Sequence, residues 1–235
     1  MRRLAMLALC ASVGASFAGA ADAAPRKRAV HKAPPPMPEI ERKTNYPSFY
    51  LGVHLGGGWS HLAGDASASP SGVIGGLQAG LNYQVDNLVF GAETELSAAG
   101  MSGGGSGTIG GTSVTGSAKH DWFATLAGRF GVASGRTLYF LKGGVAWTEY
   151  KRDYRSAAGG TATDSGTRTG WLIGFGIEHA LTETVSGKIE YNYMDFGSST
   201  VTPATTGGIA ATAAALKIDT HVVKVGLNQR FTPFR

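Results

Sequence analysis

The sequence predicts an all-β protein, an eight-stranded antiparallel up-and-down transmembrane β-barrel. Three observations lead to this fold class. Eight segments alternate apolar and polar residues with a period of two, no segment shows a convincing helical period, and the connections between segments are alternately short and long. An even number of antiparallel strands, with tight turns at one end and long loops at the other, is typical of bacterial outer-membrane barrels.

The last segment, HVVKVGLNQRF, shows the alternation clearly. Val223, Val225 and Leu227 share one face of the expected strand, and charged or polar side chains such as Lys224 and Asn228 share the other. The same pattern recurs along the chain. In order, the expected strands are 48–60, 73–85, 88–98, 118–132, 138–151, 168–181, 185–196 and 217–231.

The connections separate the two ends of the expected barrel. Short connections follow the second, fourth and sixth strands, at 86–87, 133–137 and 182–184. Long connections include 98–117 and 197–216, which are rich in Gly, Ser, Thr and Ala and almost uncharged. Because this composition cannot bury a core, we expect mobile, adaptable surface loops there, and both chain ends in the periplasm.

Alternation alone does not show which face of each strand points inward, but the aromatic residues do. Aromatic rings settle at the two interfaces of a membrane, so an apolar face bracketed by two aromatic belts should face lipid. A soluble core plugged by rings at both ends is the alternative. Trp59, Trp122, Trp147 and Trp171 fall near the long-loop end of their strands, and Phe49, Tyr83, Phe130, Tyr139 and Phe231 near the short-turn end.

The polar face then lines the lumen. It carries five cations and four anions, with Arg230 placed at the periplasmic mouth. Near-balance of charge suggests ion pairs, because an unpaired charge in a narrow interior is costly, and eight strands enclose a space that side chains can largely fill. We expect a polar network that holds the barrel shut, made of Glu93, Glu95, Arg129, Lys142, Glu178, Lys188, Glu190 and Lys224.

The chain divides into four parts. Residues 1–20 have a basic start, an apolar run and a small-residue cleavage site, so they read as a secretory signal peptide, with cleavage also consistent with a site up to residue 23. Residues 21–47 are Pro-rich and basic and read as a disordered periplasmic tether. The barrel is expected over 48–231, followed by a short tail, 232–235.

Composition excludes several other classes. The single cysteine, Cys10, lies in the signal peptide, so the exported chain should contain neither disulfides nor cysteine-based zinc sites. The net charge of +5 comes entirely from residues 1–47, since residues 48–235 hold 13 basic and 13 acidic side chains. A nucleic-acid partner is therefore not expected. Beyond residue 20 no apolar run approaches the roughly 20 residues of a spanning helix.

Several segments resemble a known family. SFYLGVHLGGGW, LYFLKGGVAW, GWLIGFGIEHAL, KIEYNYMDFG and THVVKVGLNQRF are similar to segments of the small outer-membrane β-barrel proteins of alphaproteobacteria, a porin-like group of surface antigens. The likeness covers roughly residues 48–231 in matching order. It implies an abundant envelope protein with an OmpA-like barrel, and some members are linked to host contact or haemin binding.

The chain departs from that family at its end. Members usually finish on an aromatic residue that the barrel-assembly machinery is thought to recognise, whereas this chain continues past Phe231. We also expect no peptidoglycan-binding domain of the kind that larger OmpA-type proteins carry after the barrel. Expected partners are outer-membrane lipid and lipopolysaccharide, the assembly machinery through the last strand, and peptidoglycan or another anionic surface through the basic tether.

Histidines are the only candidates for a cofactor or a catalytic base. His61 and His120 are weak candidates for haem ligands, and the alternative is that they are ordinary loop and interfacial residues. A lipid-modifying enzyme would need a nucleophile and a base within hydrogen-bond reach, and the Ser60–His61 neighbourhood is the nearest approach. We expect no enzyme, no resident cofactor and no metal site.

The sequence thus favours a structural and surface-interaction protein of the cell outer membrane, with a largely plugged, salt-bridged lumen. The alternative is a narrow porin-like channel for small ions or solutes. Lumen charges would then line a pathway instead of closing it.

Overall fold

The computed structural model describes residues 48–210 and 213–231. The expected signal peptide, the tether and the tail after Phe231 lie outside the described residues. Within the described ranges no helix is long and apolar enough to cross a membrane.

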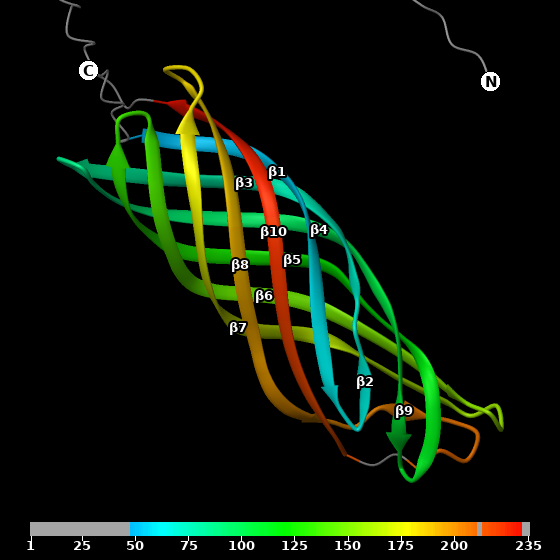
Figure 1. The fold of residues 1–235 in the computed structure, drawn as a ribbon. Coiled ribbons are helices and arrows are strands. Elements are labelled where there is room, and N and C mark those ends of the chain that lie inside the picture. Colours follow the sequence, from blue (N-terminus) through cyan, green and yellow to red (C-terminus); the bar gives the residue numbers. More distant parts are fainter. Residues whose placement is uncertain (1–47, 211–212, 232–235) are drawn as a thin grey trace, which may run out of the picture. The chain divides into compact units, whose positions relative to one another are not determined.

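Eight long antiparallel strands form a closed ring, which confirms the expected fold class. β1 pairs with β3 on one side and with β10 on the other, from Phe49 opposite Phe231 to Gly64 opposite Leu216. The ends of β1 and β10 therefore meet at one end of the ring (Figure 1). The long strands are β1 (Ser48–Gly64), β3 (Ser71–Val85), β4 (Leu88–Ile109), β5 (Thr112–Ser134), β6 (Thr137–Ser156), β7 (Thr161–Ala180), β8 (Val185–Val201) and β10 (Ala214–Phe231), and the short ones are β2 (Ala66–Ala68) and β9 (Ala204–Thr205).

Three tight turns gather at the end where β1 begins. β3 and β4 are joined by Asp86 and Asn87, and Asp86 adopts a positive φ of 54° that a two-residue hairpin needs. β5 and β6 are joined by Gly135 and Arg136 alone, so this turn is shorter than the five residues that the sequence suggested. Residues 181–184 join β7 and β8.

The expected long loop at 98–117 is wrong, because these residues are strand. β4 and β5 continue as a paired ladder to Ile109 opposite Thr112, and only Gly110 and Gly111 form the turn. Both glycines have positive φ, as the favoured two-residue hairpin turn requires. The segment 197–216 is only partly a loop, since β8 reaches Val201 and β10 begins at Ala214.

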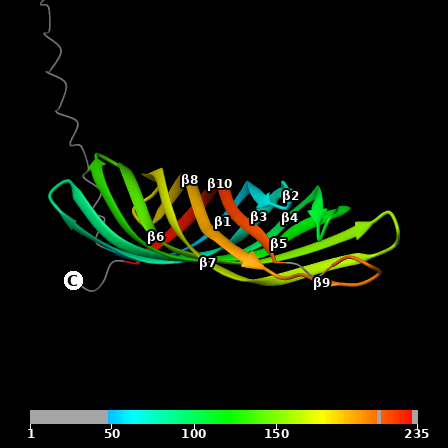
Figure 2. The same cartoon turned by 90° about the horizontal axis from the view of Figure 1, so that it is seen from below.

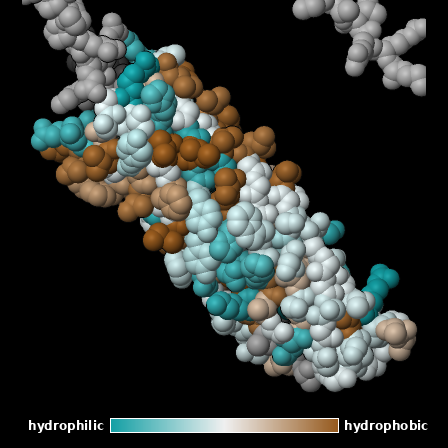
Figure 3. Space-filling model, in the orientation of Figure 1, coloured by the Kyte–Doolittle hydropathy of each residue, from teal (hydrophilic) through white to brown (hydrophobic). Residues whose placement is uncertain are grey.

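The ring has two parts with different surfaces. We call the part beyond the four tryptophans the crown (residues 60–71, 99–121, 148–170 and 195–220) and the rest of the described ring the trunk. Every exposed large hydrophobic side chain of the described residues, such as Leu55 and Leu77, belongs to the trunk. Figure 3 shows the same division: hydrophobic residues gather toward the end with the tight turns, and the opposite end is pale or hydrophilic.

The interior of the ring changes in the opposite sense. The trunk interior holds charged and polar side chains together with apolar ones such as Phe140 and Leu172, whereas the crown interior is mainly apolar and includes Leu62, Met101 and Ile218. β-Bulges lie between the two parts, between Ala98 and Met101 on β4 and between His120 and Phe123 on β5. Bulges change local twist, so they let the strands bend as they leave the trunk (Figure 2).

Candidate functional site

The polar interior of the trunk contains all eight residues of the expected network. Six strands contribute them: β4 provides two glutamates, β8 provides a lysine and a glutamate, and β5, β6, β7 and β10 provide one residue each. All of them lie on the inward face, because alternate residues of a strand point to opposite sides. None is more than 4% exposed: Glu93, Glu95, Arg129, Lys142, Glu178, Lys188, Glu190 and Lys224.

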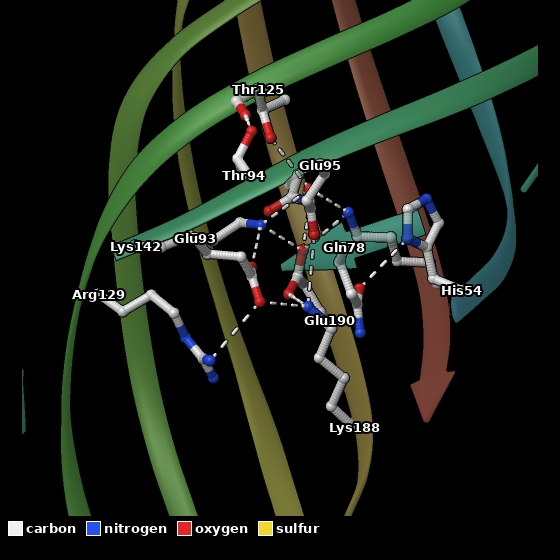
Figure 4. A network of polar contacts seen from close by, with 12 residues as sticks. His54, Gln78, Glu93, Thr94, Glu95, Thr125, Arg129, Lys142, Lys188 and Glu190 are labelled. Atoms are coloured by element: carbon white, nitrogen blue, oxygen red, sulfur yellow. Dashed lines mark hydrogen bonds and ion pairs between the residues drawn. The ribbon is translucent and has the colours of Figure 1, made fainter. Parts of the chain in front are cut away.

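Three lysines and three glutamates form the centre of this network. Lys142 lies 2.6 Å from Glu190, 3.1 Å from Glu93 and 3.2 Å from Glu95. Lys188 contacts the same three carboxylates at 2.9 to 3.3 Å. Figure 4 shows both ammonium groups directed at the carboxylates from different strands. Lys224 completes the group, 2.6 Å from Glu95 and 3.1 Å from Glu190.

Arg129 extends the network toward the tight turns. Its guanidinium lies 2.9 Å from Glu178 and 3.5 Å from Glu93, and it stacks on the ring of Phe140 with its carbon 4.1 Å from the ring centre. The Tyr50 hydroxyl donates a hydrogen bond to Glu93 at 2.7 Å and accepts one from Arg129 at 2.6 Å. Tyr50 therefore bridges Arg129 and Glu93 and reinforces the contact between them.

The network is electrically neutral, with four cations and four anions. Charges removed from water are tolerated when their partners are close and their remaining hydrogen-bonding atoms are satisfied. Glu93, Glu95 and Glu190 converge closely enough to suggest a metal site. A cation placed among them would, however, meet the ammonium groups of three lysines, so the arrangement does not fit a metal ion.

Uncharged side chains surround the ions, and the sequence analysis did not name some of them. Thr125 donates a hydrogen bond to Glu95 at 3.1 Å, and Ser186 donates one to Glu178 at 2.5 Å. His54 contacts Gln78 and Ser97 through its two ring nitrogens. Tyr50, Thr125 and Ser186 share the inward parity of their charged neighbours, so parity was the signal that could have identified them.

An apolar layer covers the ions on the side of the crown. On each contributing strand it begins one to three inward positions beyond the charged residue: Val222 follows Lys224, and Met194 follows Glu190. Because seven of the eight long strands contribute at this level, the layer extends across the lumen. Its members at this level include Ile74, Met101, Phe123, Ala127, Ala146, Leu172, Met194 and Val222.

The aromatic residues expected in the two belts all lie on the outward face of their strands. Trp59 and Trp171 are 42% and 51% exposed, and Trp122 and Trp147 are partly covered. At the opposite end Phe49 contacts Phe231 with ring centres 6.1 Å apart. Tyr83, Phe130 and Tyr139 are also exposed there.

The two histidines considered as haem ligands are not brought together. His120 is completely buried inside the ring and contacts Thr148, whereas His61 is exposed on the outer face of β1. Ser60 also points inward and shares a hydrogen bond with Thr220 at 2.6 Å, so it turns away from His61. These residues therefore form neither one ligand set nor a nucleophile–base pair.

Comparison with known proteins gives the same fold and adds the family. Residues 7–231 match the model of the outer membrane protein beta-barrel domain. The chain is 29% identical to the 31 kDa outer-membrane immunogenic protein of Brucella melitensis over 95% of its length and 98% of the relative. It is 28% identical to the 25 kDa outer-membrane immunogenic protein of Brucella abortus, over 98% of this chain and all of the relative.

A solved structure supports the architecture. The outer membrane protein OprG from Pseudomonas aeruginosa superposes with a TM-score of 0.53 at 15% identity, over 81% of this chain and all of that one. At this identity the likeness concerns the fold. The resemblance to small alphaproteobacterial barrel proteins is confirmed by the family match and the Brucella relatives, and the chain belongs to the outer-membrane β-barrel family.

Proposed function

We propose that this protein is a structural and surface-displayed component of the outer membrane whose lumen is closed. One observation carries the proposal: a neutral, buried ion network and an apolar layer lie in series along the lumen of the trunk. Each layer alone would hinder passage of a solute. Because the two layers together close the lumen, the function of the protein lies in the barrel wall and its exposed surface.

An ion crossing the trunk would encounter two different barriers. It would first have to separate ammonium and carboxylate groups that lie 2.6 Å apart, such as those of Lys142 and Glu190. Separating a buried ion pair is costly because each charge loses its partner in a poorly hydrated space. Beyond the ions, the apolar layer around Met194 and Val222 offers no polar partner, and such constrictions close a path by excluding water.

The crown is then the part available for contact outside the cell. We infer that the tight turns and both chain ends face the periplasm, because this orientation is usual for barrels with short turns at one end. The Brucella relatives are named immunogenic, which supports a surface-displayed crown. This function needs neither a reaction nor a cofactor.

Planar-bilayer recording of the refolded chain tests whether the lumen conducts. The natural chain should give no conductance steps, and neither should Lys142→Gln or Glu190→Gln, because the apolar layer remains in both. The two variants should instead be less stable than the natural chain. Unheated gel mobility and circular dichroism establish that each silent sample is a folded barrel.

Conductance steps would contradict the closed lumen if their size or ion selectivity changed in Lys142→Gln or Glu190→Gln. That result would mean that these charges line a pathway, and the narrow channel would replace the structural role. Steps that were identical in all three chains would point to leakage around the protein, which protein-free and heat-denatured controls can identify.

A further inference from the structure

The wall of the crown is interrupted between β7 and β8. The ladder between these strands runs from Ala180 opposite Ser186 to Trp171 opposite Asp195. β7 is next paired on this side at Thr163, opposite Ala204 of β9. No ladder pair among the described residues covers β7 between these points, and β8 still lies beside Gly170, so we call residues 164–169 the seam.

The seam presents backbone hydrogen-bonding groups that have no ladder partner. Thr161 and Thr206 exchange two backbone hydrogen bonds, of 2.8 and 3.3 Å, across this side of β7. In an antiparallel strand every second residue points its N–H and C=O to the same side, so Ser165, Thr167 and Thr169 direct theirs into the seam. The ladder to β6 uses the groups on the opposite side and is continuous.

Two features of the chain keep the seam open. Gly197 has a φ of 69°, and its N–H donates to the carboxylate of Asp195 at 2.7 Å, so β8 bends just beyond its last pair with β7. Pro203 precedes β9 and has no N–H with which to extend that strand. The described residues of β8 and β9 therefore do not close the seam.

A polar groove of about 430 Å³ lies at one end of the seam. This volume is within the range of small-molecule sites in proteins. The groove brings together side chains from β6, β7 and the segment before β9, and they offer carboxylates, an ammonium group and hydroxyls. Its polar lining consists of Lys151, Asp153, Thr163, Asp164, Ser165 and Thr202.

Two of the charged groups of this lining, Asp164 and Lys151, are held by residues outside the groove. The buried guanidinium of Arg152 holds Asp164 at 2.8 Å. Lys151 is held at 2.5 Å by Asp121, which lies on the neighbouring strand β5. The carboxylate of Asp153 forms no hydrogen bond or ion pair with the described residues, so its acceptor oxygens are available to a ligand.

We propose that the groove binds a short saccharide, either neutral or carrying an amino group. Sugar hydroxyls both donate and accept hydrogen bonds, which matches a site that combines carboxylates, hydroxyls and unpaired backbone groups. The lining has two carboxylates against one ammonium group, so an anionic sugar is disfavoured. This site lies in the crown wall and does not depend on whether the lumen is closed.

NMR of the refolded full-length chain in detergent micelles tests the proposal. The probes are the N-acetylglucosamine disaccharide, the glucosamine disaccharide and glucuronic acid. The first two should cause saturable shifts in the backbone amide signals of Thr163, Ser165 and Thr167, and glucuronic acid should not. Absence of saturable shifts with all three probes overturns the proposal.

Two substitutions and a matched control make the test specific. Asp153→Ala should weaken binding about tenfold, because hydrogen bonds to charged groups are among the stronger ones. Ser165→Pro removes a donor that faces the seam while leaving the ladder to β6 in place, and it should also weaken binding. Asp65→Ala changes another exposed aspartate of the crown, outside the groove, and should have no effect. Equal weakening in all three variants overturns the site.

Further arms separate the source of the sugar and the class of ligand. If the shifts are present without added sugar in vesicles that contain lipopolysaccharide, and absent in phospholipid vesicles, the saccharide belongs to the surrounding leaflet. Their appearance only on adding the disaccharides assigns it to an external glycan. If an extended peptide of alternating Thr and Glu shifts the seam amides and the sugars do not, the seam accepts a strand, and the saccharide proposal is wrong.

Discussion

The trunk and the crown are built from the same strands, yet nearly all of the buried charged side chains lie in the trunk. β10 passes through both. In the trunk Lys224 is 3% exposed and its neighbour Val223 is 41% exposed, while in the crown Leu216 is 1% exposed and its neighbour Lys217 faces outward. Even-numbered residues of β10 point inward throughout, so the strand keeps its orientation and only the chemistry of its two faces is exchanged.

The medium outside the wall explains the exchange. An outer-membrane barrel meets hydrocarbon around its trunk, where apolar side chains need no interior to leave water. The crown extends beyond the aromatic residues into water, so its apolar side chains gain stability only by facing inward, as in a soluble barrel. One closed sheet can therefore be stable in both media if its apolar residues face outward in the membrane and inward in water. Here β-bulges lie where that change occurs.

The largest expected effect comes from Lys224 of β10. Lys224→Met should lower the free energy of unfolding by about 3 to 5 kcal/mol, because it leaves buried carboxylates with one cation fewer. Glu95 and Glu190 are the groups that lose their contact, at 2.6 and 3.1 Å. Urea unfolding of the protein refolded in lipid vesicles measures the change.

Lys217→Met, the same substitution on the same strand, is the control for this measurement. Lys217 is exposed in the crown, and substitutions at such positions usually change stability by no more than about 0.5 kcal/mol. Similar losses in the two variants would mean that trunk and crown do not differ in how they hold charge.

A smaller loss of stability is expected when two leucines of β1, one in the crown and one in the trunk, are each replaced by alanine. Leu62 is 1% exposed inside the crown, and Leu62→Ala should cost about 2 to 4 kcal/mol because it leaves a cavity in a packed core. Leu55 is 63% exposed on the trunk, where acyl chains can fill the space that the side chain vacates. Leu55→Ala should therefore cost only the transfer of the lost methyl groups, about 1 to 2 kcal/mol.

The same urea titrations compare the two leucine variants. If Leu55→Ala lowered the free energy of unfolding more than Leu62→Ala, the crown interior would not be a packed core. The inward apolar face of the crown would then not contribute to stability as we expect.

The trunk could be predicted from the sequence almost completely. Its strands alternate aliphatic and charged residues, so period, parity and the aromatic residues defined its eight strands and two faces. The inward charges were also identifiable, because Lys142, Glu190 and their partners stand alone among apolar neighbours on each strand. Which cation contacts which carboxylate could not be predicted, since that depends on the stagger of strands that are far apart in the sequence.

The crown was harder to predict because its alternation is weak. Residues 98–117 contain small side chains on both faces, so they give no hydrophobic period and resemble a loop. Their pairing as β4 and β5 instead follows from the ladder that begins in the trunk and from the turn at Gly110 and Gly111. The seam could not be predicted from β7 alone, because its open edge depends on Gly197 and Pro203 in the neighbouring segments.

The smallest expected effect contrasts two ion pairs of similar length. Lys151 lies 2.5 Å from Asp121 on the outer surface of the crown, and Lys224 lies 2.6 Å from Glu95 inside the trunk. Lys151→Ala should nevertheless lower the free energy of unfolding far less than Lys224→Met does, because water screens the exposed pair and both side chains must be ordered to form it. Even this difference should vanish in about 1 M salt, where charges are screened within roughly 3 Å, whereas the loss in Lys224→Met should persist because its partners are shielded from solvent. Urea unfolding at low and high salt measures both losses, and a salt-independent loss in Lys151→Ala as large as that in Lys224→Met would show that burial does not set the strength of these pairs.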